Sequence, residues 1–310
     1  MRLIAAFFRL VRLPNLFFIA LTQVLFQFAI YEKLYPGSAT VPEHLHFLWL
    51  VLASLFIAAA GYIINDYFDI NIDEINKPGR MVVGRIISRR WAIAWHFMLS
   101  AAGVLLTALA VPFLQKWYLV LANMGVVALL WLYSTNFKKQ LLVGNIVIAL
   151  LTAWTLLIVF FSKVTVADAF GLGARHHDKF FRLAALYASF AFIATLIREA
   201  IKDMEDLPGD EKYGCRTMPV VWGVNSTKVY VAVWLIVLLS LLIAVQVYIM
   251  QFQWWAAVVY CFALLFVPVL LIFYQLFRAR SVAQFHRLST WIKLVMLAGI
   301  LSMVFFYFYL

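Results

Sequence analysis

The sequence NDYFDINID at residues 65–73 ends one long apolar run, and DMEDLPGD at residues 203–210 ends another. Both stretches place three aspartates with the spacing D-x-x-D-x-x-x-D: Asp66, Asp69 and Asp73, then Asp203, Asp206 and Asp210. With the glutamates beside them, residues 65–74 hold four and residues 199–211 hold six of the chain's 14 carboxylates. The chain therefore contains two acidic clusters with the same spacing of aspartates.

The rest of the chain is apolar. Its 310 residues are 66% hydrophobic and only 13% charged, with a mean hydropathy of +0.95, which is too little polar surface for a soluble domain of this size. Nine stretches approach the roughly 20 apolar residues that cross about 30 Å of hydrocarbon. We therefore predict an all-α, multi-pass membrane protein with spans near 14–34, 45–65, 91–112, 116–134, 141–162, 180–201, 227–250, 254–277 and 289–310.

The first 13 residues combine apolar side chains with three arginines. Arg2, Arg9 and Arg12 precede the first apolar run, as in a signal peptide, but that run is too long and no small-residue cleavage site follows it. We read it as a retained span. The preceding segment is predicted to be a short amphipathic helix in the membrane interface, stopped by Pro14.

We attribute the net charge of +11 to the orientation of the chain in the membrane rather than to nucleic-acid binding. An excess of Lys and Arg marks the cytoplasmic side of a membrane protein. On the nine-span arrangement, the N-terminus and the loops after the even-numbered spans hold most of the 25 basic residues. We therefore place the N-terminus and both acidic clusters in the cytoplasm, with the chain in the inner or plasma membrane if the organism is prokaryotic. Only six basic residues fall on the other side: Lys33, Lys116, Lys163, Arg175, Lys179 and Arg182.

Four spans separate the two acidic clusters, as expected for a tandem duplication of a four-helix unit with a ninth span added. We predict one domain over residues 1–310. Cys215 and Cys261 fall in a polar loop and in a span, so neither a disulfide nor a zinc site is expected. The pair His176 and His177 is more typical of a solvated loop than of a metal site.

The two clusters have the ligand chemistry of a magnesium site. On a helix, Asn65, Asp66, Asp69 and Asp73 fall on one stripe, as do Asp203, Asp206 and Asp210, although Pro208 and Gly209 are predicted to end the second helix before Asp210. Oxygen ligands without neighbouring His or Cys favour Mg²⁺, which commonly shares its shell with substrate phosphate oxygens. The basic residues that follow the clusters are suited to the outer oxygens of a diphosphate: Lys77, Arg80, Arg85, Lys212 and Arg216.

The alternative is an ordinary pair of loops in which acids pair with neighbouring bases. It is disfavoured because the loops after the fourth and eighth predicted spans contain no acid at all. A transporter is a second alternative, but transporters usually carry their charges near the middle of the bilayer.

At these residues the chain resembles the UbiA superfamily of intramembrane prenyltransferases. Asn65–Asp73 fits the family motif NDxxDxxxD, NKPGRMVVGRIIS at residues 76–88 is similar to the family's NKPxRPxxxGxIS, with Met81 in place of the usual proline, and YSTNFKKQLLVGN at 133–145 resembles its tyrosine, basic-pair and Gly-Asn element. The resemblance implies transfer of a polyprenyl group from a prenyl diphosphate, with two Mg²⁺ ions. It implies Asn65, Asp69, Asp203 and Asp206 as direct metal ligands, and Asp66, Asp73 and Asp210 either as ligands through water or as residues that support the direct ligands.

The resemblance also suggests residues for the substrates. Lys77, Arg80, Lys138 or Lys139, and Arg216 would bind diphosphate oxygens, and Tyr62, Phe68 and Tyr133 are candidates to face an allylic cation. The stretch IREAIKDMEDLPGDEKYGCRTMPV at 197–220 is most similar to the form found in digeranylgeranylglyceryl phosphate synthases, which favours a phosphoglycerol lipid acceptor. Arg198 and Lys202 are candidates either to bind the phosphate of this acceptor or to pair with Glu199. Arg12 is expected to be an interfacial anchor. An aromatic acceptor, of the 4-hydroxybenzoate, homogentisate or naphthoate type, is the alternative.

Overall fold

The computed structural model describes residues 2–37, 40–76, 79, 81–169 and 178–310, and within these ranges nine helical segments are long and apolar enough to cross a membrane. The predicted all-α membrane fold is confirmed, and the described residues form no strand beyond an isolated bridge between Val83 and Ile87. The crossing segments are α2 (Leu13–Leu25) continued by η1 (Phe26–Tyr31) and α3 (Glu32–Leu34), α4 (Val41–Phe68), α6 (Arg89–Ala110), α7 (Phe113–Thr135), α8 (Val143–Lys163), α10 (Asp178–Lys212), α12 (Gly223–Met250), α13 (Trp255–Cys261) continued by η3 (Phe262–Phe266) and α14 (Val267–Arg278), and α15 (Val282–Leu301) continued by α16 (Val304–Tyr309).

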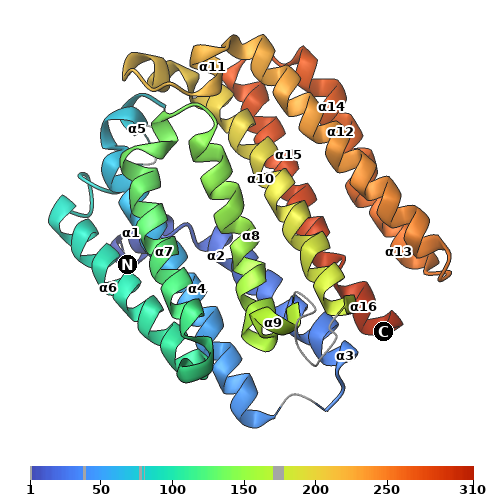
Figure 1. Ribbon diagram of the computed structural model, residues 1–310. Helices are drawn as coiled ribbons and strands as arrows, with labels where there is room; N and C mark the ends of the chain where they lie inside the picture. Colours follow the sequence, from blue (N-terminus) through green and yellow to red (C-terminus); the bar gives the residue numbers. More distant parts are fainter. Residues whose placement is uncertain (1, 38–39, 77–78, 80, 170–177) are drawn as a thin grey trace.

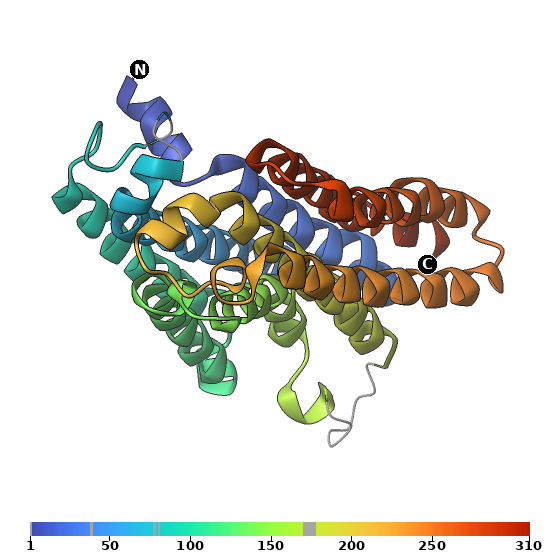
Figure 2. The same ribbon diagram turned by 90° about the horizontal axis from the view of Figure 1, so that it is seen from above.

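The two helices that end in acidic clusters organise the packing. Helix α4 packs against α6 and α7, and α10 packs against α8, α12 and α15. The blue-to-green helices α4, α6 and α7 lie on one side of the bundle, the orange and red helices α12, α14 and α15 lie on the other, and α2, α8 and α10 lie between them (Figures 1 and 2). Small buried residues such as Ala60 and Ala200 allow this close approach of helices.

Helix α10 continues through its proline, which corrects our expectation that it would end before Asp210. It runs 35 residues, to Lys212, with Pro208 inside. A proline normally breaks a helix partly because it leaves backbone groups without partners. Here Asn76, the last residue of the short helix α5 (Ile70–Asn76), hydrogen-bonds to the backbone on both sides of the proline: its Nδ2 donates to the carbonyl of Asp206 (3.0 Å), and its Oδ1 accepts from the N–H of Gly209 (2.9 Å).

Glycine is required at position 209 by this contact. A Cβ there would lie 2.5 Å from Nδ2 of Asn76, which is closer than any real contact. Asn76 therefore joins the end of the first acidic cluster to the backbone of the second.

The N-terminal helix α1 (Arg2–Leu10) is present as predicted but ends before Pro14, which lies instead in the first turn of α2. The chain turns at Arg12, whose φ of 52° and ψ of 55° are left-handed. That conformation costs a non-glycine residue roughly 1–2 kcal/mol, so the contacts of Arg12 must stabilise it.

Candidate active site

Both acidic clusters line one cavity of about 440 Å³. Asn65 and Asp66 come from the last turn of α4, and Asp69 and Asp73 from its junction with α5. All three aspartates of the second cluster come from the end of α10. The structure therefore brings together the seven predicted oxygen ligands: Asn65, Asp66, Asp69, Asp73, Asp203, Asp206 and Asp210.

The first cluster spans a small break between two helices. Asp69, at φ −89° and ψ 0°, separates α4 from α5. The helical pattern of backbone hydrogen bonds nevertheless continues across the break. The N–H of Asp69 donates to the backbone carbonyl of Asn65 (3.0 Å), and the N–H of Asp73 donates to the backbone carbonyl of Asp69 (2.8 Å). The predicted stripe of side chains therefore persists across the break.

Arg12 belongs to the site, which corrects its expected role as an interfacial anchor. Its guanidinium donates to Asp66 Oδ1 at 2.7 Å and to Asn65 Oδ1 at 3.4 Å, and it lies over the ring of Tyr62, 5.1 Å from the ring centre. Burial opposes the charge, but the Asp66 carboxylate outweighs this effect and raises the pKa of the Arg12 guanidinium above its ordinary value. These contacts account for the left-handed turn at Arg12.

The basic pair after α7 lies in the short helix η2 (Phe137–Lys139), and both lysines line the cavity. Lys138 forms an ion pair with Asp69. This position depends on Gly144 at the start of α8, since a Cβ there would lie 2.8 Å from the Lys138 Cα. The next residue, Asn145, donates to Asp203 Oδ2 at 2.9 Å. One Gly-Asn pair therefore supports both acidic clusters.

The end of the second cluster is held by the loop that follows α10. Asp210 is only 8% exposed and accepts a hydrogen bond of 3.1 Å from Thr217 Oγ1. The thiol of Cys215 also lines the cavity. Burial, and then the charge of Asp210, raise the pKa of this thiol.

Three cations of α10 and α15, which we call the basic wall, line the cavity: Arg198, Lys202 and Lys293. Arg198 and Lys202 both approach Glu199, at 2.6 and 3.9 Å, and both line the cavity, as does Lys293 of α15. Within the described residues, no carboxylate lies within salt-bridge distance of Lys293. The sequence reading missed Lys293, although a lone lysine in the ninth apolar run was a visible signal, because ionisable residues inside membrane spans are commonly functional.

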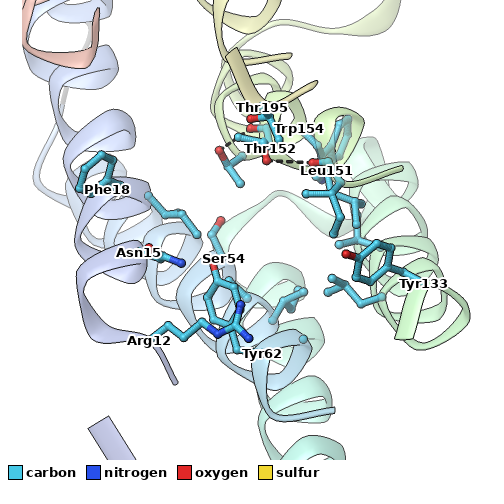
Figure 3. A pocket seen from close by; sticks show the side chains of 18 of the residues that line it. Arg12, Asn15, Phe18, Ser54, Tyr62, Tyr133, Leu151, Thr152, Trp154 and Thr195 are labelled. Atoms are coloured by element: carbon cyan, nitrogen blue, oxygen red, sulfur yellow. Dashed lines mark hydrogen bonds between the residues drawn. The ribbon is translucent and has the colours of Figure 1, made fainter. Parts of the chain in front are cut away.

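A second cavity, of about 220 Å³, adjoins the first and extends between the helices (Figure 3). The two share Arg12, Asn15, Asn65, Tyr133, Arg198, Glu199, Lys202 and Lys293. Figure 3 shows Tyr62 beside Arg12, and Tyr133 on the opposite side of the cavity. Deeper in, Trp154 Nε1 donates to Asn123 at 3.0 Å, and the buried Thr195 hydroxyl has no partner within the described part of the chain.

Several predicted residues lie elsewhere. Lys212 and Arg216 are exposed and do not line either cavity. Phe68 lines neither cavity and packs edge-on against Trp131, with ring centres 5.7 Å apart. Lys77, Arg80, His176 and His177 lie outside the described residues.

The donor set fits magnesium that is shared with a phosphate. Among the residues described, no three His, Cys, Asp or Glu side chains converge into a metal site of their own. The carboxylates instead come from two separate parts of the cavity lining, α4–α5 and α10, and basic partners hold Asp66 and Asp69. Mg²⁺ suits this arrangement because it usually takes one or two carboxylates and completes its shell with water and substrate phosphates.

Comparison with known proteins gives the same result as the motifs. A model of the UbiA prenyltransferase family matches residues 20–297, which is most of the chain. The chain belongs to the UbiA prenyltransferase family. Among curated UbiA-type relatives, the digeranylgeranylglyceryl phosphate synthase of Haloquadratum walsbyi is 39% identical over 180 residues, or 58% of this chain and 57% of that protein. The synthase of Methanosphaera stadtmanae is 27% identical over 82% of this chain and 86% of its own length.

The family fold extends over nearly the whole chain. A structure of a digeranylgeranylglyceryl phosphate synthase superimposes with a TM-score of 0.63 at 20% identity, covering 98% of this chain and 99% of that one. A UbiA homologue from Archaeoglobus fulgidus, solved with DMAPP and Mg²⁺, superimposes with a TM-score of 0.58 at 17% identity, over 96% and 98% of the two chains. The match spans just over half of two of these relatives: 57% of the Haloquadratum synthase, and 57% of the digeranylgeranylglyceryl phosphate synthase of Thermococcus sibiricus, which is 31% identical over 58% of this chain.

Proposed function

We propose that this chain catalyses Mg²⁺-dependent transfer of a polyprenyl group from a prenyl diphosphate to an acceptor in the membrane. The observation that carries the proposal is the single cavity lined by both acidic clusters and continuous with a more apolar cavity between the helices. A prenyl diphosphate has the same two parts, an anionic head and an apolar chain.

The acidic clusters and the basic pair of η2 serve the diphosphate. Two Mg²⁺ ions are expected, with Asn65 and Asp69 as ligands on one wall and Asp203 and Asp206 on the other, while Asp66, Asp73 and Asp210 act through water. When bound, Mg²⁺ neutralises the charge that develops on the leaving diphosphate. Lys138 and Lys139 line the same cavity and bind the outer oxygens. Lys77 and Arg80 stay predicted ligands for these oxygens, whereas the exposed Lys212 and Arg216 are left out of the proposal.

The reacting carbon lies where the two cavities meet. The bond between the prenyl carbon and diphosphate oxygen breaks with its electron pair on oxygen. The acceptor's hydroxyl oxygen bonds to that carbon, and the hydroxyl proton passes to the released diphosphate. Tyr62 and Tyr133 line the adjoining cavity, where their rings can face the allylic cation without reacting with it.

For the acceptor, we favour a geranylgeranylglyceryl phosphate-like lipid. The basic wall holds three cations, and only two of them, Arg198 and Lys202, approach the carboxylate of Glu199, which leaves Lys293 for a phosphate. The names of the curated relatives point to the same acceptor. From the distribution of Lys and Arg, we also infer that the N-terminus and the cavity face the cytoplasm.

An acceptor panel tests this proposal. The purified chain, in detergent with Mg²⁺ and labelled geranylgeranyl diphosphate, is offered geranylgeranylglyceryl phosphate, 4-hydroxybenzoate, homogentisate and a dihydroxynaphthoate in turn. We expect a prenylated product with the phosphate lipid alone. Product with an aromatic acid alone would assign the aromatic alternative, and no product with any acceptor or donor length would contradict prenyl transfer.

A further inference from the structure

A third cavity, of about 700 Å³, lies far from the site described above. It is lined by residues of α10, α12, α13 and the C-terminal helices α15 and α16, and shares no lining residue with the two site cavities. Helices α13 and α16 lie at the lower right of Figure 1. Its wall is apolar, with Leu186, Leu242 and Phe305 among the lining residues. Its volume lies within the range of about 300–1,000 Å³ typical of ligand pockets.

The cavity belongs to the opposite membrane leaflet. It is lined by the first turns of α10, including Arg182, whereas the acidic cluster begins at Asp203 on the same helix. At 1.5 Å per residue these two positions lie about 32 Å apart along the helix axis, which is close to the full hydrocarbon thickness.

Aromatic residues place part of this cavity at the level of lipid headgroups. Tyr248, Trp254 and Tyr309 line it, and the rings of Trp254 and Tyr309 stack with centres 4.8 Å apart. Trp and Tyr concentrate at the boundary between hydrocarbon and water. An amphiphile in this cavity would therefore have its polar end beside these rings.

The same cavity carries two exposed cations, Lys179 and Arg182. Neither forms a salt bridge within the described ranges. Only six of the chain's 25 basic residues were assigned to this side of the membrane, and two of these six line this one cavity. A positive pair beside an apolar cavity complements an anionic headgroup joined to a hydrocarbon chain.

We propose that this cavity binds an anionic phospholipid from the leaflet opposite the active site, with one hydrocarbon chain among α10, α12 and α13 and the phosphate at Lys179 and Arg182. The bound chain fills the space between these helices and thereby stabilises α10, whose far end carries the second acidic cluster. The site is independent of the proposed reaction, so its test needs no enzyme activity.

The test compares phosphatidylglycerol with phosphatidylcholine added to the full chain in an uncharged detergent. Retained lipid is counted by native mass spectrometry, and the melting temperature is recorded in parallel. Two variants address the site: Lys179→Gln with Arg182→Gln removes the charge, and Ala244→Phe obstructs the cavity from an exposed lining position. The matched control is Lys33→Gln, a cation assigned to the same side that does not line the cavity.

We expect wild-type protein and Lys33→Gln to retain phosphatidylglycerol at least fivefold better than phosphatidylcholine and to melt at a higher temperature with it. The charge variant should lose this preference, and Ala244→Phe should retain less of both lipids. Equal retention of the two lipids by the wild type, or an unchanged preference in the charge variant, would overturn the proposal. If a variant does not fold, phosphatidylglycerol with a photoreactive chain decides on the wild type: crosslinks in the lining segments 182–190, 241–261 or 299–310 support the site, and crosslinks only elsewhere contradict it.

Discussion

The side-chain oxygen of Asn76, on α5, accepts a hydrogen bond of 2.9 Å from the backbone N–H of Gly209, on α10. The side-chain nitrogen Nδ2 of Asn76 donates a hydrogen bond to the backbone carbonyl of Asp206. A single side chain thus ties the end of the first acidic cluster to the backbone of the second, beside Pro208 inside α10.

Replacement of Asn76 by alanine should loosen this tie. We expect a loss of roughly 1–3 kcal/mol in stability, because two backbone groups lose their partner. Displacing the second cluster by even 1 Å should lower kcat by about 10- to 100-fold. Melting temperature and steady-state prenyl transfer measure the two effects. The exposed Asn71 on the same helix gives the matched control, Asn71→Ala, which should change neither; equal behaviour of the two variants would remove the role assigned to Asn76.

The Lys138–Asp69 pair should depend on glycine at position 144. Gly144→Ala places a Cβ against the Lys138 backbone, so it should raise KM for the prenyl diphosphate in the same direction as Lys138→Met. Gly125→Ala is the control, because a Cβ at Gly125 meets no atom within 4 Å. Initial rates over a range of donor concentrations decide the point. If Gly144→Ala matches Gly125→Ala, the close packing at η2 does not position Lys138.

Lys293 should act on the acceptor alone. In Lys293→Met we expect KM for a phosphate-bearing acceptor to rise about tenfold or more, since hydrogen bonds to charged groups contribute about 1.5–3 kcal/mol. KM for the prenyl diphosphate should stay within twofold of wild type. Separate titrations of donor and acceptor distinguish the two, and a rise in the donor KM alone would reassign Lys293 to the diphosphate.

Lys116 offers the opposite case, a buried lysine with a structural role. Its ammonium donates to the carbonyls of Phe161 and Ser162, at 3.1 and 2.6 Å, near the end of α8. Lys116→Met should therefore lower stability by roughly 1–3 kcal/mol, because buried carbonyls lose their donor. The kcat of the folded protein should be unchanged. A large fall in kcat without a fall in melting temperature would show that Lys116 serves the reaction.

The nine spans were predictable because membrane crossing requires long apolar stretches, a property of local composition. The convergence of Asp69 with Asp203 followed from the repeated motif and the topology. The length of α10 was not predictable, because the partner that stabilises it past Pro208 is Asn76, 130 or more positions away in sequence. Arg12 was misjudged for a similar reason, since only the tertiary structure brings it to Asp66. The tandem duplication of a four-helix unit stays a prediction.

The most direct measurement is a Mg²⁺ titration of prenyl transfer in wild type, Asp69→Asn and Asp206→Asn, each confirmed to be folded. The two residues belong to different clusters and line one cavity, so each change alone should lower the rate at saturating substrate by about 100-fold or more. Chelation of Mg²⁺ should abolish the wild-type rate. Wild-type activity in either variant, or activity without a divalent cation, would contradict the claim that the two clusters act together on one diphosphate.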